Sequence, residues 1–319
     1  MLILGGDIGG TKTLLALAEP GGLPLFERRY PSQNYAEFDT LLGVFLAEAR
    51  AAGLDAPIRA AAFGVAGPVD NNRAQLTYLP WLMDGADIAR RFDLGRATLA
   101  NDFAAAASGI ASLKPEQIVT LQAGKPLPGA PRVALGAGTG LGVAFLMMQG
   151  ESWRVLPGEG GHMGFAPADE EQAALWIELR AETGRVTTET VVSGPGLARI
   201  HRHVSRTSGQ STDDDLREPA AISAAALAGD DPIAARSVEL FLSCYGAFAG
   251  DLALAVLARG GVYLCGGVAP KLLPLFQASG FLQAFNAKGC HAALASAMPV
   301  HVVTEERLGL LGALRICEG

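Results

Sequence analysis

The same arrangement, a short strand followed by a glycine-rich turn and a second strand, is predicted twice in this sequence, at residues 5–13 and at residues 136–142. Glycine accepts positive φ and lets backbone N–H groups approach an anion closely, and Thr11 and Thr139 add a hydroxyl donor to each turn. Taken alone, each turn is more often an ordinary hairpin than a phosphate site. As a phosphate site, each turn suits one end of a triphosphate.

Neither turn fits the common nucleotide motifs that open a helix. A Walker loop needs Gly-Lys-Ser/Thr at the start of a helix, and the Rossmann fingerprint needs G-x-G-x-x-G in the same position. Here Lys12 follows Thr11 and leads into a run that is too short for a helix, and Gly142 leads into another β-type run. The sequence therefore predicts two β-hairpins and argues against both motifs.

Strand and helix patterns alternate along the chain, which predicts an α/β fold. In the first third, the β-type runs are residues 1–8, 12–18, 25–29, 59–65 and 96–100. Apolar residues with a 3.6-residue period begin at Phe38 and stop before Gly53, so we expect a core-facing helix there. A chain of 319 residues is long enough for two domains, and a connection rich in Pro and Gly places their boundary within residues 110–131.

The composition argues against a nucleic-acid partner. The net charge is −7 at pH 7, whereas proteins that bind nucleic acids gather Lys and Arg on one face. The most basic cluster, formed by Arg199, Arg202, His203 and Arg206, is spaced to share one side of a helix. We interpret that cluster as a solvated helix face.

Neither a secretion signal nor a membrane span is expected. The apolar start of the chain is interrupted by Gly5, Gly6 and Asp7, and the apolar residues 241–265 are interrupted by charges. The four cysteines are more than twenty residues apart and lack the paired spacing of a structural zinc site, so we interpret them as reduced thiols. Together these features predict a soluble, cytoplasmic protein.

Asn101 and Asp102 follow a predicted strand and open an Ala-rich helix. As an N-cap pair, they would accept hydrogen bonds from the first N–H groups of that helix. As a functional pair, they would supply a general base for a hydroxyl nucleophile, with the helix N-terminus keeping the carboxylate of Asp102 ionised. The reduced basicity suits phosphoryl transfer, in which positioning and charge neutralisation dominate. Both interpretations stay open for this segment alone.

The segment Gly158-Glu159-Gly160-Gly161-His162 has too many glycines for a helix. We expect an irregular loop on which Glu159 and His162 converge on a ligand. A carboxylate beside an imidazole suits sugar hydroxyls, since a charged hydrogen bond is worth about 1.5–3 kcal/mol where water is excluded. A plain loop and a metal pair are the alternatives, although no third metal ligand has recognisable spacing.

Six segments, taken in order along the chain, resemble the bacterial glucokinase family. They are Gly6-Asp7-Ile8-Gly9-Gly10-Thr11, Leu99-Ala100-Asn101-Asp102-Phe103, Gly136-Ala137-Gly138-Thr139-Gly140-Leu141-Gly142, Leu156-Pro157-Gly158-Glu159-Gly160-Gly161-His162, Ser193-Gly194-Pro195-Gly196-Leu197 and Gly266-Gly267-Val268-Ala269-Pro270. The resemblance extends from residue 6 to about residue 312, and six ordered motifs are far more specific than any one of them.

The resemblance implies a two-domain, actin-like ATPase (ribonuclease H-like) fold with ATP and sugar in an interdomain active-site cleft. It implies a small α/β domain of residues 1–112, completed by a C-terminal helix within residues 303–319, and a large α/β domain of residues 113–302. The implied activity is the ATP-dependent phosphorylation of glucose at its 6-hydroxyl, a reaction of glycolysis that uses Mg²⁺. The resemblance also implies a homodimer.

The resemblance assigns a role to each motif. Asp102 would be the general base that takes the proton of the 6-hydroxyl. The other sugar hydroxyls would be held by Asn101, Glu159, His162 and Glu189, of which Glu189 reads from the sequence alone only as a polar residue before a strand. The residues implied in ATP binding are Gly6, Asp7, Ile8, Gly9, Gly10, Thr11, Gly138, Thr139, Gly140, Gly266 and Gly267. Among these, Asp7 would act on Mg²⁺ indirectly, and the last two glycines would border the adenosine.

Three positions depart from the family pattern. Lys12 and Tyr78 stand where Asn is expected, and Gly164 stands where Asp is expected. Because Tyr78 and Gly164 would lie close to the hydroxyl-binding groups, the departures put sugar selectivity in doubt. The Cys-rich zinc motif of the related repressor-and-kinase branch is absent from the sequence.

Other functions on the same fold stay open. The chain could phosphorylate fructose, mannose or an amino sugar, and polyphosphate could replace ATP. A non-catalytic sugar-sensing protein is another alternative, but the strand-like start leaves no room for a DNA-binding module. An actin-like filament or chaperone-type ATPase would not need Asn101, Glu159 and His162 together.

Overall fold

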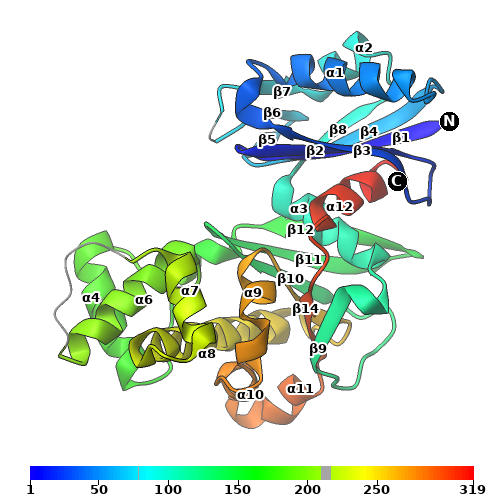
Figure 1. Cartoon of the computed structure of the whole chain (residues 1–319). Helices are drawn as coiled ribbons and strands as arrows, with labels where there is room; N and C mark the ends of the chain where they lie inside the picture. The colour runs from blue at the N-terminus through cyan, green and yellow to red at the C-terminus, as the bar shows by residue number, and fades with distance from the viewer. Residues whose placement is uncertain (78, 210–216) are drawn as a thin grey trace. The chain divides into compact units, whose positions relative to one another are not determined.

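The computed structural model describes residues 1–77, 79–209 and 217–319, and the described chain divides into two compact units (Figure 1). The first unit comprises Met1–Lys114, Trp153–Pro157 and Glu305–Gly319, and the second comprises Pro115–Ser152 and Gly158–Thr304. Tyr78 lies outside the described residues. The domain boundaries expected from the sequence stay a prediction.

The first unit is built on a five-stranded sheet with the order β3-β2-β1-β4-β8, beside a three-stranded sheet with the order β5-β6-β7. The strands are β1 (Leu2–Ile8), β2 (Lys12–Ala18), β3 (Pro24–Pro31), β4 (Ile58–Val65), β5 (Val69–Asp70), β6 (Arg73–Gln75), β7 (Leu82–Asp84) and β8 (Ala97–Asn101). The helices are η1 (Ser32–Asn34), α1 (Phe38–Ala51), α2 (Gly85–Arg91), α3 (Asp102–Gly109), η2 (Ile110–Ser112) and α12 (Leu308–Ile316).

The predicted hairpins and the predicted first helix are confirmed. β1 pairs antiparallel with β2, and β2 pairs antiparallel with β3. β4 and β8 continue the sheet in parallel with β1. Helix α1 begins at Phe38, and its apolar stripe is buried.

Side chains of β1 alternate between the two faces of the sheet, as the two-residue period of a strand requires. Figure 1 shows α1 over one face and α3 with α12 over the other. Leu4 belongs to the apolar cluster under α1, whereas Ile3 shares a cluster with Leu314 of α12. A Cβ placed on Gly5 would lie 2.7 Å from the Cγ of Leu314. Odd-numbered residues of β1 therefore face α12, and Asp7 is the next of them.

Helices α3 and α12 pack so closely that their contact admits no side chain at the crossing. A Cβ on Gly312 would lie 1.6 Å from the carbonyl oxygen of Ala105, and one on Gly109 would lie 2.6 Å from that of Leu308. The end of α12 is tied to the sheet, since the Sγ of Cys317 donates to Leu4 O at 3.3 Å. Residues at the two ends of the chain thus build one core.

The second glycine-rich turn also joins an antiparallel pair, as predicted. The six-stranded sheet has the order β12-β11-β10-β13-β14-β9. Its strands are β9 (Ile118–Gln122), β10 (Arg132–Ala137), β11 (Leu141–Gln149), β12 (Ser152–Gly158), β13 (Gly261–Cys265) and β14 (Val300–Val303). β10 pairs antiparallel with β11 and parallel with β13. The carboxyl ends of β10 and β13 therefore meet at one edge of the sheet.

The other regular elements of the second unit are helices. They are η3 (Pro115–Gln117), η4 (Gly160–His162), α4 (Glu170–Thr183), α5 (Thr188–Val191), α6 (Gly194–Thr207), α7 (Pro219–Ala228), α8 (Pro232–Val256), α9 (Val268–Phe276), α10 (Phe281–Asn286), η5 (Gly289–His291) and α11 (Ala292–Ser296).

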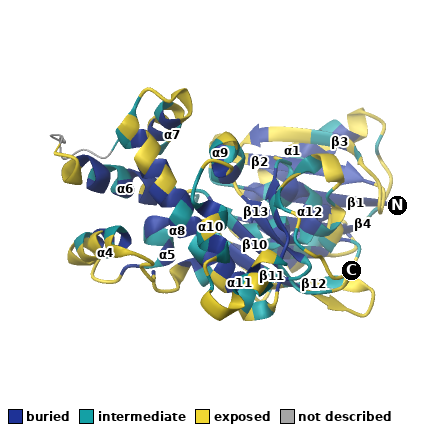
Figure 2. Cartoon of the chain, turned by 90° about the horizontal axis from the view of Figure 1, so that it is seen from below, coloured by how far each residue is buried: buried dark blue, intermediate teal, exposed yellow. Residues whose placement is uncertain are grey.

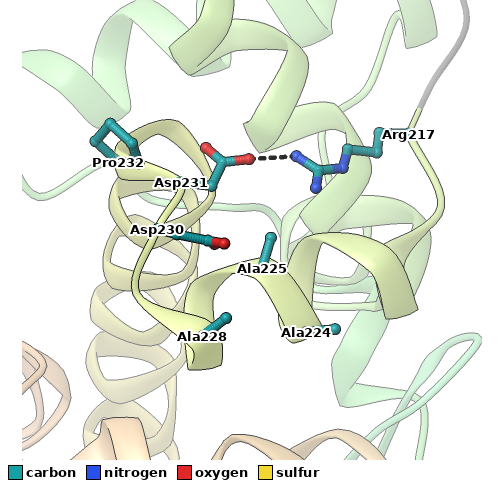
Figure 3. Close-up of a pocket in the computed structure, with 7 residues that line it drawn as sticks. All are labelled: Arg217, Ala224, Ala225, Ala228, Asp230, Asp231 and Pro232. Carbon is teal, nitrogen blue, oxygen red and sulfur yellow. Dashed lines mark hydrogen bonds and ion pairs between the residues drawn. The ribbon is translucent and has the colours of Figure 1, made fainter.

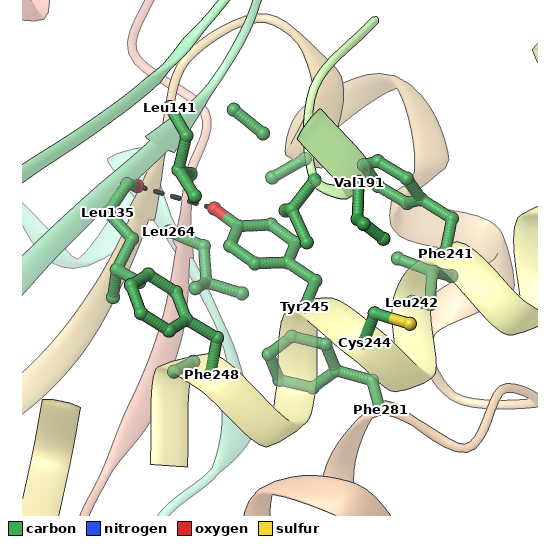
Figure 4. Close-up of a cluster of buried hydrophobic side chains, with 14 of the residues drawn as sticks. Leu135, Leu141, Val191, Phe241, Leu242, Cys244, Tyr245, Phe248, Leu264 and Phe281 are labelled. Atoms are coloured by element: carbon green, nitrogen blue, oxygen red, sulfur yellow. Dashed lines mark hydrogen bonds between the residues drawn. The ribbon is translucent and has the colours of Figure 1, made fainter. Parts of the chain in front are cut away.

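The long helix α8 forms the centre of the second unit's core. Its buried Tyr245 donates a hydrogen bond at 3.4 Å to the carbonyl oxygen of Leu135 on β10, and Phe241 and Phe281 pack against its ring (Figure 4). By length and composition alone, α8 is the one described helix that could cross a membrane. However, 67% of its most apolar window is buried (Figure 2). Its apolar character is that of a core helix.

The basic cluster of α6 is not a solvated face, so that interpretation was wrong. His203 is 4% exposed, and its Nδ1 lies 2.7 Å from the Oε2 of Glu178 on α4. Arg206 binds the other oxygen of the same carboxylate at 2.9 Å, and Arg202 pairs with Glu182. The glutamates that enclose these side chains are one turn apart on α4, and no pattern within α6 reveals them.

Candidate active site

The turn at residues 9–11 joins β1 to β2 and presents backbone donors. The N–H of Gly9 closes the turn by donating to Lys12 O at 3.0 Å. Within the described chain, the N–H groups of Gly10 and Thr11 make no hydrogen bond. Successive backbone N–H groups without acceptors form a site that favours an anion. The turn thus has the donors that the sequence predicted.

Two carboxylates lie beside this turn within the first unit. Asp7 is on the face of β1 that meets α12, where a Cβ on Gly309 would lie 2.9 Å from its Cγ. Burial raises the pKa of Asp7 above its usual range, the negative charge of Asp102 adds to the rise, and Lys12 opposes it. The structure therefore brings Asp7 and Asp102 close enough for their charges to interact.

Asn101 performs the capping role that the sequence left open. Its Oδ1 accepts from the N–H of Phe103 at 3.0 Å and from the N–H of Ala104 at 3.2 Å. Asp102 Oδ1 accepts from the N–H of Phe103 at 2.7 Å. A carboxylate at the first turn of a helix is stabilised by the exposed N–H groups and the helix dipole. Asn101 therefore caps the helix, and Asp102 accepts a hydrogen bond in its first turn.

The turn at residues 138–140 in the second unit is held from outside. The N–H of Gly194, at the start of α6, donates to Gly138 O at 2.7 Å. The N–H of Leu141 donates to the Oε2 of Glu189 at 2.8 Å. A Cβ on Gly140 would lie 2.6 Å from that oxygen, so a side chain there would displace the carboxylate of Glu189. The carboxylate of Glu189 is thus part of the support of this turn.

The structure corrects two local predictions. Glu189 does not precede a strand but lies in the short helix α5, which is capped by Thr187. Residues 160–162 form one turn of 3₁₀ helix, η4, instead of an irregular loop. Gly161 is required there, because a Cβ would lie 2.1 Å from the carbonyl oxygen of Leu141.

The segments that carry Glu159, His162 and Glu189 contact one another in the second unit. The N–H of Thr188 in α5 donates to the carbonyl oxygen of Met163, directly after η4, at 2.8 Å. Glu159 and His162 are exposed, and Glu189 is half-buried. Gly164 follows with open space around its Cα, so the departure at this position leaves room for a ligand or a longer side chain.

A cavity of about 620 Å³ lies next to the second turn, a volume typical of small-molecule sites. It is lined by Gly138 and Thr139, by Gly267 before α9, and by the first residues of α6 and α7. Gly266 adopts φ +80°. This positive φ, which glycine adopts without strain, turns the chain out of β13 towards the cavity. Gly138, Thr139 and Gly267, three of the predicted nucleotide residues of the second unit, therefore line one hollow, whereas Gly140 and Gly266 are not among its lining residues.

Sequence reasoning missed part of this cavity. Ser193 and Gly194, which open α6, were quoted for the resemblance without a role, and Arg217 and Lys271 were not singled out. Lys271 is exposed in the second turn of α9 and has no ion-pair or hydrogen-bond partner within the described chain. The structure thus adds Lys271 as a candidate phosphate-binding residue, because it is a cation without a partner in the described chain and lines the cavity.

A second hollow of about 700 Å³ adjoins the entry to α7 and α8 (Figure 3). Arg217 lines both hollows, and its Nη1 donates to the Oδ2 of Asp231 at 2.6 Å. The N–H of Ala234 and the guanidinium of Arg217 hold the pKa of Asp231 below its usual range. Since Asp231 also caps α8, this ion pair fixes the segment that enters α7.

Comparisons with known proteins agree with this geometry. A glucokinase from Nostoc sp. is 39% identical over 98% of this chain and 97% of its own. The crystal structure of a glucokinase from an Antarctic psychrotroph has a TM-score of 0.90 and 31% identity, covering 99% of this chain and 98% of the other. A ROK family glucokinase from Streptomyces griseus, solved in complex with glucose and AMPPNP, has a TM-score of 0.64 and 21% identity, over 99% of each chain.

The fold and the paired glycine-rich turns define a sugar kinase with the actin-like ATPase fold. The family model for glucokinase matches residues 4–318. The chain belongs to the glucokinase family, and it is a hexose kinase.

Proposed function

We propose that the chain transfers the γ-phosphoryl group of ATP to the 6-hydroxyl of glucose, with Asp102 as the general base. The observation that carries the proposal is the carboxylate pair, Asp7 and Asp102, beside a turn with unpaired N–H donors. One carboxylate accepts a proton and the other acts near the metal, while the turn holds phosphate oxygens.

The proposed step is an in-line displacement. The 6-oxygen of glucose forms a bond to the γ-phosphorus as the bond from that phosphorus to the β-bridging oxygen breaks, and ADP leaves. The proton of the 6-hydroxyl passes to Asp102. Because the transition state is loose in most analyses, the proton moves late and a weak base suffices. The hydrogen bond from Phe103 N–H to Asp102 helps to fix the carboxylate in place.

We assign the remaining glucose hydroxyls to Glu159, His162 and Glu189, with Asn101 as a weaker contact. The contacts between η4 and α5 support a common role for the first three. The Oδ1 of Asn101 already accepts two backbone hydrogen bonds, so its Nδ2 is the group left for a sugar oxygen. Its present acceptor, Gly67 O, is distant at 3.4 Å.

For ATP, we assign the base and ribose to the cavity lined by Gly267 and the start of α6 and α7. Gly138, Thr139 and Gly140 bind phosphate oxygens, with Lys271 supplying a positive charge. The turn formed by Gly9, Gly10 and Thr11, with Gly6 and Ile8 in the strand that leads to it, binds the terminal phosphates. Mg²⁺ neutralises these phosphates when it is bound.

The metal's direct ligands would be phosphate and water oxygens. In the part of the chain that the structure describes, no group of three His, Cys, Asp or Glu side chains is arranged to hold a metal ion. Asp7 fits an indirect role, because Mg²⁺ keeps several waters and a half-buried carboxylate orients them through hydrogen bonds. Asp7 and Asp102 also concentrate negative charge where a cation is favoured.

Sugar-dependent ADP release tests the function. We expect turnover with glucose and ATP to exceed that with fructose, mannose, glucosamine and N-acetylglucosamine, and polyphosphate to be a poor donor. Highest kcat/KM with an amino sugar would move the assignment to that substrate. Sugar binding without any ADP release would instead indicate a sensing protein.

The cell location and the assembly follow from the same proposal. We propose a cytoplasmic location, because the substrates are cytoplasmic metabolites and the four cysteines are free thiols, and a homodimer, because the family resemblance implies one. Light scattering after size-exclusion chromatography measures the mass against the 33.0 kDa of one chain. A monomer at micromolar concentration would contradict the dimer and leave the chemistry intact.

A further inference from the structure

We propose that the buried hydroxyls of Ser32 and Thr13 position the turn at residues 9–11 for phosphate binding, so that both are positioning residues for the phosphoryl transfer. The inference rests on the proposed function. It assigns a role to two fully buried residues that lie outside the six family motifs.

Ser32 reaches the turn from the end of β3. It is the first residue of η1, and its exposed fraction is 0%. Its N–H donates to Thr11 O at 3.0 Å, and its Oγ donates to Gly9 O at 2.7 Å. Both carbonyl groups that flank the middle of the turn are therefore bound by one residue.

Thr13 completes this clamp from β2. Its Oγ1 lies 2.9 Å from the Oγ of Ser32, and its exposed fraction is 0%. The single hydroxyl proton of Ser32 is directed at Gly9 O, so the proton between the two hydroxyls comes from Thr13. The result is a chain of hydrogen bonds from Thr13 through Ser32 to the turn, which fixes the Ser32 hydroxyl in its donating direction.

By binding the carbonyl groups of Gly9 and Thr11, the clamp also sets the direction of the backbone N–H groups that follow them. In a planar trans peptide, the C=O and the following N–H point in opposite directions. Because Gly9 C=O points to Ser32, the N–H of Gly10 points away from Ser32. Because Thr11 C=O also points to Ser32, the N–H of Lys12 likewise points away from Ser32. The clamp thus turns two carbonyl oxygens, which would repel a phosphate, away from the face that presents N–H groups.

The clamp also limits the motion of a flexible turn. Two consecutive glycines have unusually broad conformational freedom, and ordering each backbone residue costs about 1–2 kcal/mol. Because Ser32 already orders the turn in the folded protein, this entropic cost does not reduce the affinity for the nucleotide. A buried hydroxyl is costly unless it is hydrogen-bonded; here the hydroxyl of Ser32 donates to the turn and the hydroxyl of Thr13 donates to Ser32.

Three variants test the inference: Ser32→Ala, Thr13→Val and Thr13→Ser. The first removes the clamp, the second removes one hydroxyl at nearly constant volume, and the third restores that hydroxyl. We expect kcat/KM for ATP to fall about tenfold in Ser32→Ala, equivalent to the loss of one hydrogen bond in the transition state. KM for glucose should stay within about twofold, and Thr13→Ser should recover most of what Thr13→Val loses.

Ser237→Ala is the matched control. Ser237 is 0% exposed in α8, and its Oγ donates to Ile233 O at 2.6 Å, so this variant also loses a buried hydrogen bond. We expect a similar drop in Tm but an unchanged KM for ATP. Wild-type kcat and KM for ATP in both Ser32→Ala and Thr13→Val would overturn the inference. Equal losses towards ATP and glucose would also overturn it, because they indicate general disorder.

Calorimetric titration with ATP separates the two proposals. If the wild type binds ATP but does not phosphorylate glucose, the proposed function fails, and the clamp is still judged by the affinity of the variants for ATP. If Ser32→Ala does not fold, the comparison of Thr13→Val with Thr13→Ser decides. ATP affinity equal in those two variants and the wild type would contradict the inference.

Discussion

The two glycine-rich turns look alike in sequence but are supported by different chemistry. In the first unit, the neutral hydroxyls of Ser32 and Thr13 hold the turn from within the sheet. In the second unit, the carboxylate of Glu189 accepts the N–H of Leu141 after the turn. A neutral support leaves the donors of the first turn with their full attraction for phosphate. A charged support reduces that attraction but couples the second turn to a residue assigned to the sugar.

The surroundings differ as well. The first turn lies beside the carboxylates Asp7 and Asp102, whereas the second borders a cavity with the cation Lys271 at its wall. These surroundings fit the proposed roles, in which the general base lies in the first unit and the base and ribose of ATP are assigned to the cavity of the second.

The largest expected effect comes from replacing Asp102, the proposed general base. In Asp102→Ala, we expect kcat to fall about 10²–10⁴-fold, because the proton of the hydroxyl loses its acceptor, while sugar affinity changes by less than about tenfold. Steady-state kinetics and glucose titration measure both. Asp169→Ala removes a carboxylate from the N-terminus of another helix, α4, and should leave kcat unchanged. A tenth of wild-type turnover in Asp102→Ala would exclude the base role.

Two substitutions at Glu189 separate its charge from its support of the second turn. Glu189→Gln keeps an oxygen for the N–H of Leu141 and should raise KM for glucose about tenfold, the value of one charged hydrogen bond. Glu189→Ala also leaves that N–H without a partner, so we expect a rise of about a hundredfold and a weaker affinity for ATP. If Glu189→Gln behaves as wild type towards glucose, the residue serves the turn alone.

Lys271→Ala tests the cavity of the second unit. We expect KM for ATP to rise about threefold to fivefold, the size of a solvent-exposed charge contact, and the effect to shrink at high salt. Lys125→Ala removes the same charge from an exposed position outside the cavity and provides the control. The assignment of phosphate to this lysine fails if both variants show the same KM for ATP as the wild type.

Asp7→Asn gives the smallest effect, one on stability. The pKa of Asp7 is raised from 3.8 in the folded chain, so the folded state binds this proton more tightly than the unfolded state. The resulting stabilisation is full below pH 3.8 and is lost as the pH rises through the raised pKa. At pH 8 the ionised carboxylate is therefore a cost that Asn removes, and we expect Tm to rise by about 2 °C.

Thermal unfolding measured from pH 8 down to pH 4 checks this prediction. The gain of Asp7→Asn over the wild type should shrink as the pH falls, because the wild-type carboxyl becomes neutral. A gain that stays constant with pH would show that burial and Asp102 do not raise the pKa of Asp7.

The sequence predicted the elements that depend on local patterns. The period of the apolar residues placed α1, and the glycines between β-type runs placed both hairpins. Six ordered motifs led to the family that the comparisons confirm. The individual roles of Asp102, Glu159 and His162 stay predictions that the experiments above test.

The sequence did not predict contacts between segments that are far apart along the chain. Ser32 reaches the turn only because β3 pairs with β2, and a single serine after a proline carries no local signal. The role of Glu189 in supporting the second turn was missed because its hydrogen bond with the N–H of Leu141 joins residues 48 apart in the sequence. His203 was misjudged since its partner, Glu178, lies on another helix.

The packing of α12 onto α3 has a consequence for synthesis of the chain. Ribosomes release β1 to α3 first and must make residues 115–304 before α12 can fill its place against Ala105 and Gly109. During that interval the nascent N-terminal segment, Met1–Lys114, keeps an apolar sheet face open to chaperones and proteases. A chain truncated before Glu305 would lack α12, and the unit left without part of its core would be the one that contains Met1–Lys114.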